Sequence, residues 1–121
     1  MGMQKILVVE DEEDIFDVLQ YSLSREGFRV LGARDGEAGV RIARDQSPTL
    51  VLLDLMLPGT DGIEVCRRLK ADPMTDSIPI IIVTAKGEES DIVLGLGMGA
   101  DDYITGTGAV RAARNRLCVR W

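Results

Sequence analysis

T-L-V-L-L-D-L-M-L-P-G-T-D-G, residues 49–62, is the stretch from which the fold of this sequence can be inferred. Its apolar run from Leu50 to Leu53 is short and lies between Pro48 and Pro58. This pattern predicts a strand buried on both faces, as in a parallel sheet, because the run is too short for a buried helix. Asp54 follows directly, and a carboxylate at the end of a buried strand is costly unless it is paired or binds a cation. Taken alone, such an aspartate more often caps the following loop, so its role depends on the rest of the chain.

The composition indicates a single globular domain. The chain has 121 residues, 45% of them hydrophobic, which is enough for a core and argues against disorder. No apolar run approaches the roughly 20 residues of a membrane helix, and no signal peptide is recognisable. Cys66 and Cys118 form no C-x-x-C motif and no histidine is present, so we expect no zinc site. We expect a cytoplasmic protein with reduced thiols and no membrane partner.

Charge is distributed unevenly along the chain. Residues 1–102 hold all 20 acids but only ten of the 14 bases, a net charge of −10, whereas the last 19 residues carry +4. An acidic body repels nucleic acid. We therefore expect no direct nucleic-acid binding by this domain.

A second buried strand, Lys5 to Val9, precedes five consecutive acids at residues 10–14. Ile15, Val18, Leu19 and Leu23 then recur at helical spacing, which predicts a helix that ends at Gly27. The helix dipole accounts for the acids in the first turn but less well for the two acids nearest the strand end.

The remaining chain continues to alternate strands with helices. Strands are predicted at 28–33, 78–83 and 101–105. Helices are predicted from Asp35-Gly36 to near Asp45, after Gly62 as far as Asp72-Pro73, from Gly87 to Leu96, and weakly in the tail. This order predicts an α/β fold, a doubly wound five-stranded parallel sheet with helices on both faces.

Right-handed crossovers place the carboxyl end of every strand at the same edge of such a sheet. The polar residues expected there are Glu10, Asp11, Asp54, Thr84 and Thr105. Three carboxylates at one point repel each other, and Mg²⁺ would relieve the repulsion. The Met56 carbonyl lies just past Asp54 and could complete the metal shell.

An aspartate beside Mg²⁺ can act as a nucleophile toward phosphorus, with the Thr84 hydroxyl as a donor. Taken alone, Thr84 is equally well explained as an ordinary strand residue.

Four motifs, in order and with matching spacing, carry a resemblance to a known family. They are V-V-E-D at 8–11, L-L-D-L-M-L-P-G-T-D-G at 52–62, P-I-I-I-V-T-A at 79–85 and G-A-D-D-Y-I-T at 99–105. Together they closely resemble the CheY-like receiver domain of two-component response regulators, most of all its OmpR and PhoB branch. The resemblance covers residues 4–105 and implies a flavodoxin-like sheet of strand order 2-1-3-4-5.

The resemblance also implies a function for the acidic residues. Asp54 would accept a phosphoryl group from a sensor histidine kinase. Asp11, Asp54 and the carbonyl of Met56 would bind Mg²⁺, with Glu10 in support through water. The domain would be a phosphoacceptor signalling domain rather than an enzyme, with at most slow self-catalysed phosphotransfer and dephosphorylation.

Two further residues would communicate the phosphorylation. By the resemblance, Thr84 and Tyr103 form the switch pair, one contacting the phosphoryl group and the other changing its packing. In the OmpR and PhoB branch a symmetric dimer uses the face that here runs from Gly87 to Thr105. That face also needs the fifth helix, so we expect a monomer or a different association in this chain.

The sequence departs from the family at residue 106. The family has Lys-Pro after the last strand, and its lysine reaches the phosphoryl group, whereas this chain has Gly106-Thr107. We therefore divide the chain into a receiver domain at 1–105 and an atypical basic tail at 106–121. Residues 109–114 can be written with codons that, read one base later, give P-F-G-P-R-E, which resembles the usual family segment. A frameshift near Gly106 is one hypothesis, and a diverged single-domain receiver is the alternative.

Two function classes stay open at this point. One is a phosphorylatable switch, and the other is a receiver-shaped interaction module that Gly106 uncouples from phosphorylation. A phosphohydrolase is disfavoured because D-L-M-L has no second aspartate two residues after Asp54.

Overall fold

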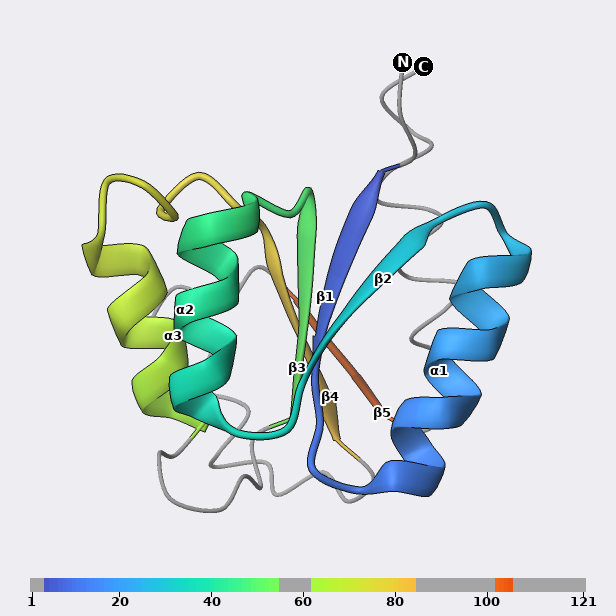
Figure 1. Cartoon of the computed structure of the whole chain (residues 1–121). Coiled ribbons are helices and arrows are strands. Elements are labelled where there is room, and N and C mark those ends of the chain that lie inside the picture. The colour runs from blue at the N-terminus through green and yellow to red at the C-terminus, as the bar shows by residue number, and fades with distance from the viewer. Residues whose placement is uncertain (1–3, 55–61, 85–101, 106–121) are drawn as a thin grey trace.

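The computed structural model describes residues 4–54, 62–84 and 102–105, and Figure 1 shows its elements. The strands are β1 (Lys5–Val9), β2 (Arg29–Ala33), β3 (Leu50–Asp54), β4 (Ile80–Thr84) and β5 (Asp102–Thr105). The helices are α1 (Glu13–Arg25), α2 (Gly36–Gln46) and α3 (Gly62–Ala71). The predicted helix at 87–96 and the helical tail lie outside the described residues.

The five strands form one parallel sheet in the order β2-β1-β3-β4-β5. Helix α1 covers one face of the sheet, and α2 and α3 lie side by side on the other (Figure 1). The α/β class, the parallel sheet and its strand order are therefore confirmed.

Alternation along the central strands explains why their sequences are continuously apolar. In β1, Leu7 and Val9 belong to the core beneath α2 and α3, whereas Ile6 and Val8 belong to the core beneath α1. Strand β3 alternates in the same way, and its residues Leu50–Leu53 are at most 1% exposed. Successive side chains of a strand point to opposite faces, so a strand covered on both sides has no polar face.

Helix α1 forms where the sequence predicts it, but it buries only some of the apolar residues at helical spacing. Leu19 and Leu23 are buried, whereas Ile15 is 37% exposed and Val18 is 61% exposed. Phe16 packs against the core beside Leu19 and Leu23.

Most helices and strands begin and end within one or two residues of their predicted boundaries. The strand predicted at 78–83 begins at Ile80, and the preceding Pro79 contributes its carbonyl, which accepts from the Val51 N–H at 3.0 Å. Asp54 belongs to β3 and is its last residue. Helix α2 begins where the sequence predicts, and Asp35 caps it, since the Asp35 carboxylate accepts a hydrogen bond from the Ala38 N–H at 2.8 Å.

Candidate functional site

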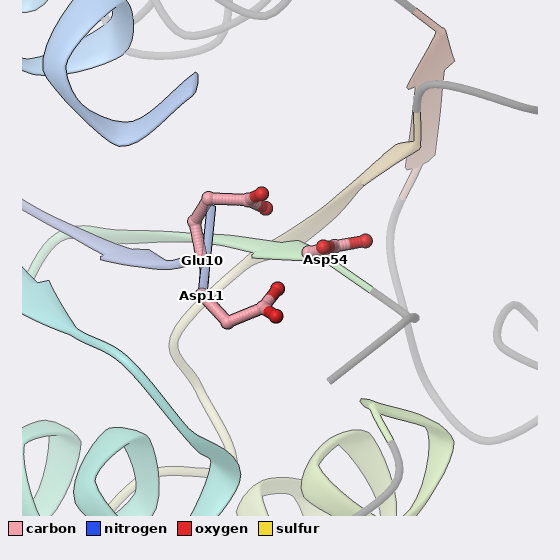
Figure 2. A group of neighbouring side chains, drawn as sticks. All are labelled: Glu10, Asp11 and Asp54. Atoms are coloured by element: carbon pink, nitrogen blue, oxygen red, sulfur yellow. The ribbon is translucent and has the colours of Figure 1, made fainter. Parts of the chain in front are cut away.

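Three carboxylates meet at the carboxyl edge of the sheet. Oxygen atoms of Glu10, Asp11 and Asp54 lie within 4.8 Å of one another. Two of these residues follow β1 and the third ends β3, and the pairing of Val9 with Leu53 brings the two strand ends together. Figure 2 shows the three carboxyl groups close together beside the strand ends. Elsewhere in the described chain no comparable group of metal-binding side chains occurs.

Glu10 is the buried member of this cluster. Only 4% of Glu10 is exposed to solvent, and its Oε1 atom is buried without a hydrogen-bond partner among the described residues. Its backbone N–H donates to the Ala33 carbonyl at 2.9 Å, which ties the end of β1 to β2. The side chain is thereby held inside the edge of the sheet.

Burial is the main reason that the pKa of Glu10 rises from 4.5 to about 8. Its hydrogen bond with Asp54 and the negative charge of Asp54 add to this effect. At neutral pH a pKa of about 8 keeps the Glu10 carboxyl of the metal-free protein largely protonated. This is the state expected of a carboxylate cluster that lacks a compensating cation.

The cluster has the donor chemistry of a hard divalent cation site. Mg²⁺ binds carboxylate oxygens and keeps several waters, so it needs only a few protein ligands. The orphaned Oε1 of Glu10 supplies an acceptor that a water molecule or ion of the metal shell would satisfy. Glu10, Asp11 and Asp54 therefore fit the metal that the sequence predicts. Met56 lies outside the described residues.

For the other predicted site residues, the structure gives the position of the backbone in the sheet. Thr84 is the last residue of β4, and its neighbour Val83 pairs with Asp54, so Thr84 lies at the same edge as the carboxylates. Tyr103 lies in β5 and pairs with Ile82, two residues before the end of β4. Gly106 falls beyond the described residues. The roles assigned to these side chains stay predictions.

Residues 6–115 match the model of the response regulator receiver domain. The chain belongs to this family. The receiver domain is a component of two-component signalling, and it is a phosphoacceptor signalling domain rather than a classical enzyme. The acidic cluster described above is consistent with its phosphoacceptor site. No helix in the described part of this receiver is long and apolar enough to cross a membrane.

Two curated relatives are similar to this receiver over nearly its whole length. The transcriptional regulatory protein AfsQ1 of Streptomyces coelicolor is 46% identical over 120 residues, 98% of this chain and 52% of the relative. The alkaline phosphatase synthesis transcriptional regulatory protein PhoP of Bacillus subtilis is 48% identical over 114 residues, 94% of this chain and 47% of the relative. The chain thus spans about half the length of these relatives. Both belong to the predicted OmpR and PhoB branch.

Two solved receiver domains are similar to this chain in sequence as well as in fold. The BeF₃-activated N-terminal receiver domain of Klebsiella pneumoniae RstA is 35% identical, with a TM-score of 0.84, covering 98% of this chain and 100% of the other. The receiver domain of the Pseudomonas aeruginosa sensor histidine kinase PA1611 is 33% identical, with a TM-score of 0.85, covering 99% and 98%. The PA1611 structure has a magnesium ion coordinated in its active-site cleft.

Proposed function

We propose that Asp54 accepts a phosphoryl group and that this modification is the signal that the domain transmits. The observation that carries the proposal is the position of Asp54. It ends a central strand that is paired on both sides, and it lies within the carboxylate cluster at the carboxyl edge. A nucleophile held by a rigid element keeps its geometry during reaction.

Exposure favours Asp54 over Glu10 as the acceptor. Glu10 is 4% exposed and holds a proton at neutral pH, so its carboxyl is both inaccessible and weakly nucleophilic. Asp54 is only partly buried. In the reaction an oxygen lone pair of Asp54 forms the new bond to phosphorus. The bond from phosphorus to the donor's leaving group breaks, and that group keeps the electron pair.

Glu10, Asp11 and Asp54 are proposed to hold Mg²⁺ together with the carbonyl of Met56. When bound, the ion would offset the charge of the phosphoryl oxygens. The magnesium ion in the PA1611 receiver supports this assignment, as does the orphaned carboxyl oxygen of Glu10. Ionisation of Glu10 would accompany metal binding, because a carboxylate is a better ligand than the protonated group.

The proposed donor is a sensor histidine kinase, because the chain is a receiver domain. Thr84 is proposed to donate a hydrogen bond to the phosphoryl group, and Tyr103 to repack in response. Their strand positions near the cluster support this pair. The expected monomer or different association stays a prediction, with a homodimer through the face from Gly87 to Thr105 as its alternative. The division of the chain at residue 105 stays a prediction too.

A second candidate function rests on the residue at position 106. Glycine there has no ammonium group for the phosphoryl oxygens. If that contact is required for the switch, the domain acts as an interaction module that no longer responds to phosphorylation. The two functions differ in whether modification of Asp54 changes the protein's conformation.

Phosphotransfer from acetyl phosphate, read by intact-protein mass, tests the first proposal. With Mg²⁺ present, the wild-type protein should gain the mass of one phosphoryl group, and Asp54→Asn should gain none. Asp45→Asn, an exposed carboxylate on α2, is the matched control and should react like wild type. A modified peptide that maps to another residue, or equal labelling of Asp54→Asn, contradicts the assignment.

A further inference from the structure

The side of the sheet that α1 covers is buried over a wider area than α1 itself spans. Leu52 of β3 and Ile81 of β4 belong to the core on this side, and each is 1% exposed. Helix α1 contacts chiefly β2 and β1, and it lies beside β2 (Figure 1). Among the described residues, α1 is the only helix on this side of the sheet.

The width of a helix limits how much of the sheet α1 can cover. Neighbouring strands lie about 4.8 Å apart, so β4 is about 10 Å from β1, whereas a helix with its side chains is about 10–12 Å across. A helix that rests on β1 and β2 therefore covers the sheet no further than about β3. The burial of Ile81 on β4 requires a second covering segment.

The direction of the chain connections identifies that segment. The connections from β3 to β4 and from β4 to β5 both move one strand in the same direction across the sheet. Right-handed crossovers place both on the same side, and α3 marks it as the side opposite α1. Handedness therefore predicts the α3 side for residues 85–101, and residues 55–61 lead directly into α3. Residues 106–121 remain to cover the strip beside α1.

This tail has the length and the apolar spacing that the strip requires. It follows the carboxyl end of β5. Residues 109–121 would form about 20 Å of helix, enough to run back along the roughly 17 Å of a five-residue strand. One face of such a helix is apolar, with residues at helical spacing. They are Val110, Ala113, Leu117 and Trp121.

The flank of α1 that borders the strip offers apolar contact. The carboxylate of Glu13 lies 3.9 Å from the guanidinium group of Arg34, which follows β2, so the Glu13 flank faces the outer edge of the sheet. Ile15 lies about 200° round the helix from Glu13, on the flank toward β3. Ile15 is 37% exposed, and Val18, nearly one turn further along, is 61% exposed.

Charge favours the tail over a second copy of this face. The tail has no acid and four arginines, Arg111, Arg114, Arg116 and Arg120. The first half of α1 is acidic and exposed, and its Asp14 and Asp17 have no ion-pair partner within the described chain. Two copies of the α1 face would bring these acids together, whereas the tail brings opposite charge to them.

We propose that residues 109–121 form a helix that docks beside α1 over β3 and β4, with its apolar face on the sheet and its arginines near the acids of α1. The tail then belongs to the folded domain, although its sequence departs from the family at residue 106 and suggested a boundary at residue 105. This docking is independent of the phosphorylation of Asp54.

Two substitutions on opposite faces of the tail test the docking in the whole chain. Leu117→Asp puts a charge on the docked face and should lower the midpoint of urea unfolding by about 1 M or more. Val119→Asp, about 200° round the helix, is the matched control and should stay within about 0.3 M of wild type. A Leu117→Asp variant that fails to fold while Val119→Asp folds also supports the docking, because an undocked tail tolerates both changes.

Contacts in the wild-type protein give the second readout. Methyl NOEs in NMR spectra should join Leu117 to at least one of Leu50, Leu52 and Ile81 on the α1 side of the sheet. Their absence, or equal urea midpoints for Leu117→Asp and Val119→Asp, would overturn the proposal. A wild-type midpoint that rises over a tenfold increase in protein concentration would assign the strip to a second copy and overturn it too.

Discussion

Glu10 is the residue whose ionisation most affects the free protein. Its pKa in the folded state is about 8, above the ordinary value of 4.5, so the folded protein keeps a proton that the unfolded chain loses between these pH values. Stability of the metal-free protein should therefore be highest below pH 4.5 as far as Glu10 is concerned, and should fall as pH rises toward 8.

Glu10→Gln should remove this pH dependence. The amide is close in shape to the protonated acid and carries no charge, so the variant should melt higher than wild type at and above pH 8 in the presence of a chelator. Thermal melts across the range from pH 4.5 to 8 measure the effect. Asp17→Asn, on the exposed side of α1, should leave the wild-type slope in place. Parallel curves for Glu10→Gln and wild type would contradict the burial argument.

Gly106 is the residue for which we predict a functional loss. A phosphoryl group adds about −2 of charge at Asp54, and glycine supplies no donor to it. Removing one preorganised donor costs roughly 10²–10³ in rate at other sites, which serves here as an upper guide. Phosphorylation should thus be slow, and the response of Thr84 and Tyr103 should be weak.

The variant Gly106→Lys tests that loss directly. It should accelerate labelling by acetyl phosphate and enlarge the NMR shift changes of Thr84 and Tyr103 with beryllofluoride. Gly108→Lys adds the same charge two residues away and is the control. If wild type already shows the full shift change and the lysine adds no rate, the interaction-module hypothesis is to be abandoned.

At the scale of elements, the packing of α1 on β2 depends on the absence of a side chain at position 32. A Cβ atom on Gly32 would lie 2.6 Å from Cζ of Phe16, far inside van der Waals contact. The Phe16 ring packs against the core, and Arg34 lies over it at 5.9 Å from the ring centroid. The ring therefore has limited room to move away.

Gly32→Ala should destabilise the protein by about 1–3 kcal/mol, the usual cost of overpacking. Adding Phe16→Leu, which shortens the side chain that is struck, should recover part of that loss. Urea unfolding of the two single variants and the double variant gives the coupling between the positions. Additive losses in the double variant would mean that the two residues do not compete for the same space.

At the scale of the whole molecule, the carboxylate cluster should link metal binding to stability. The proposed Mg²⁺ ion would bind the folded state, where three carboxylates from the ends of two strands converge, and should not recognise the unfolded chain. Saturation at about 100 times the dissociation constant would add about 2.7 kcal/mol to the free energy of unfolding.

Thermal melts over a Mg²⁺ titration measure this increment as a rise of several degrees for a domain of this size. Asp11→Ala should abolish most of the rise, because one of the three clustered carboxylates is gone. Asp76→Ala, an exposed acid outside the cluster, should retain it. A melting temperature that does not change with Mg²⁺ in the wild-type protein would argue against the metal site.

The order of strands and helices was predictable because it is encoded locally. Runs such as Leu50 to Leu53 are apolar at every position only when both faces of a strand are covered, and parallel topology then brings the acids that follow β1 and β3 to one edge. The sequence alone therefore determined the fold class, the strand order implied by the family motifs, and the membership of the acidic cluster.

Tertiary structure decided which members of a pattern are buried and what that burial does. Ile15 and Val18 match the helical period as well as Leu19 does, yet they are exposed, because the sheet contacts a different face of α1. Glu10 and Asp11 are adjacent acids in sequence, yet Glu10 is enclosed, which raises its pKa, whereas Asp11 is only half-buried. Hydrophobic period and charge are properties of a local segment, whereas burial and pKa depend on neighbours that only the folded chain supplies.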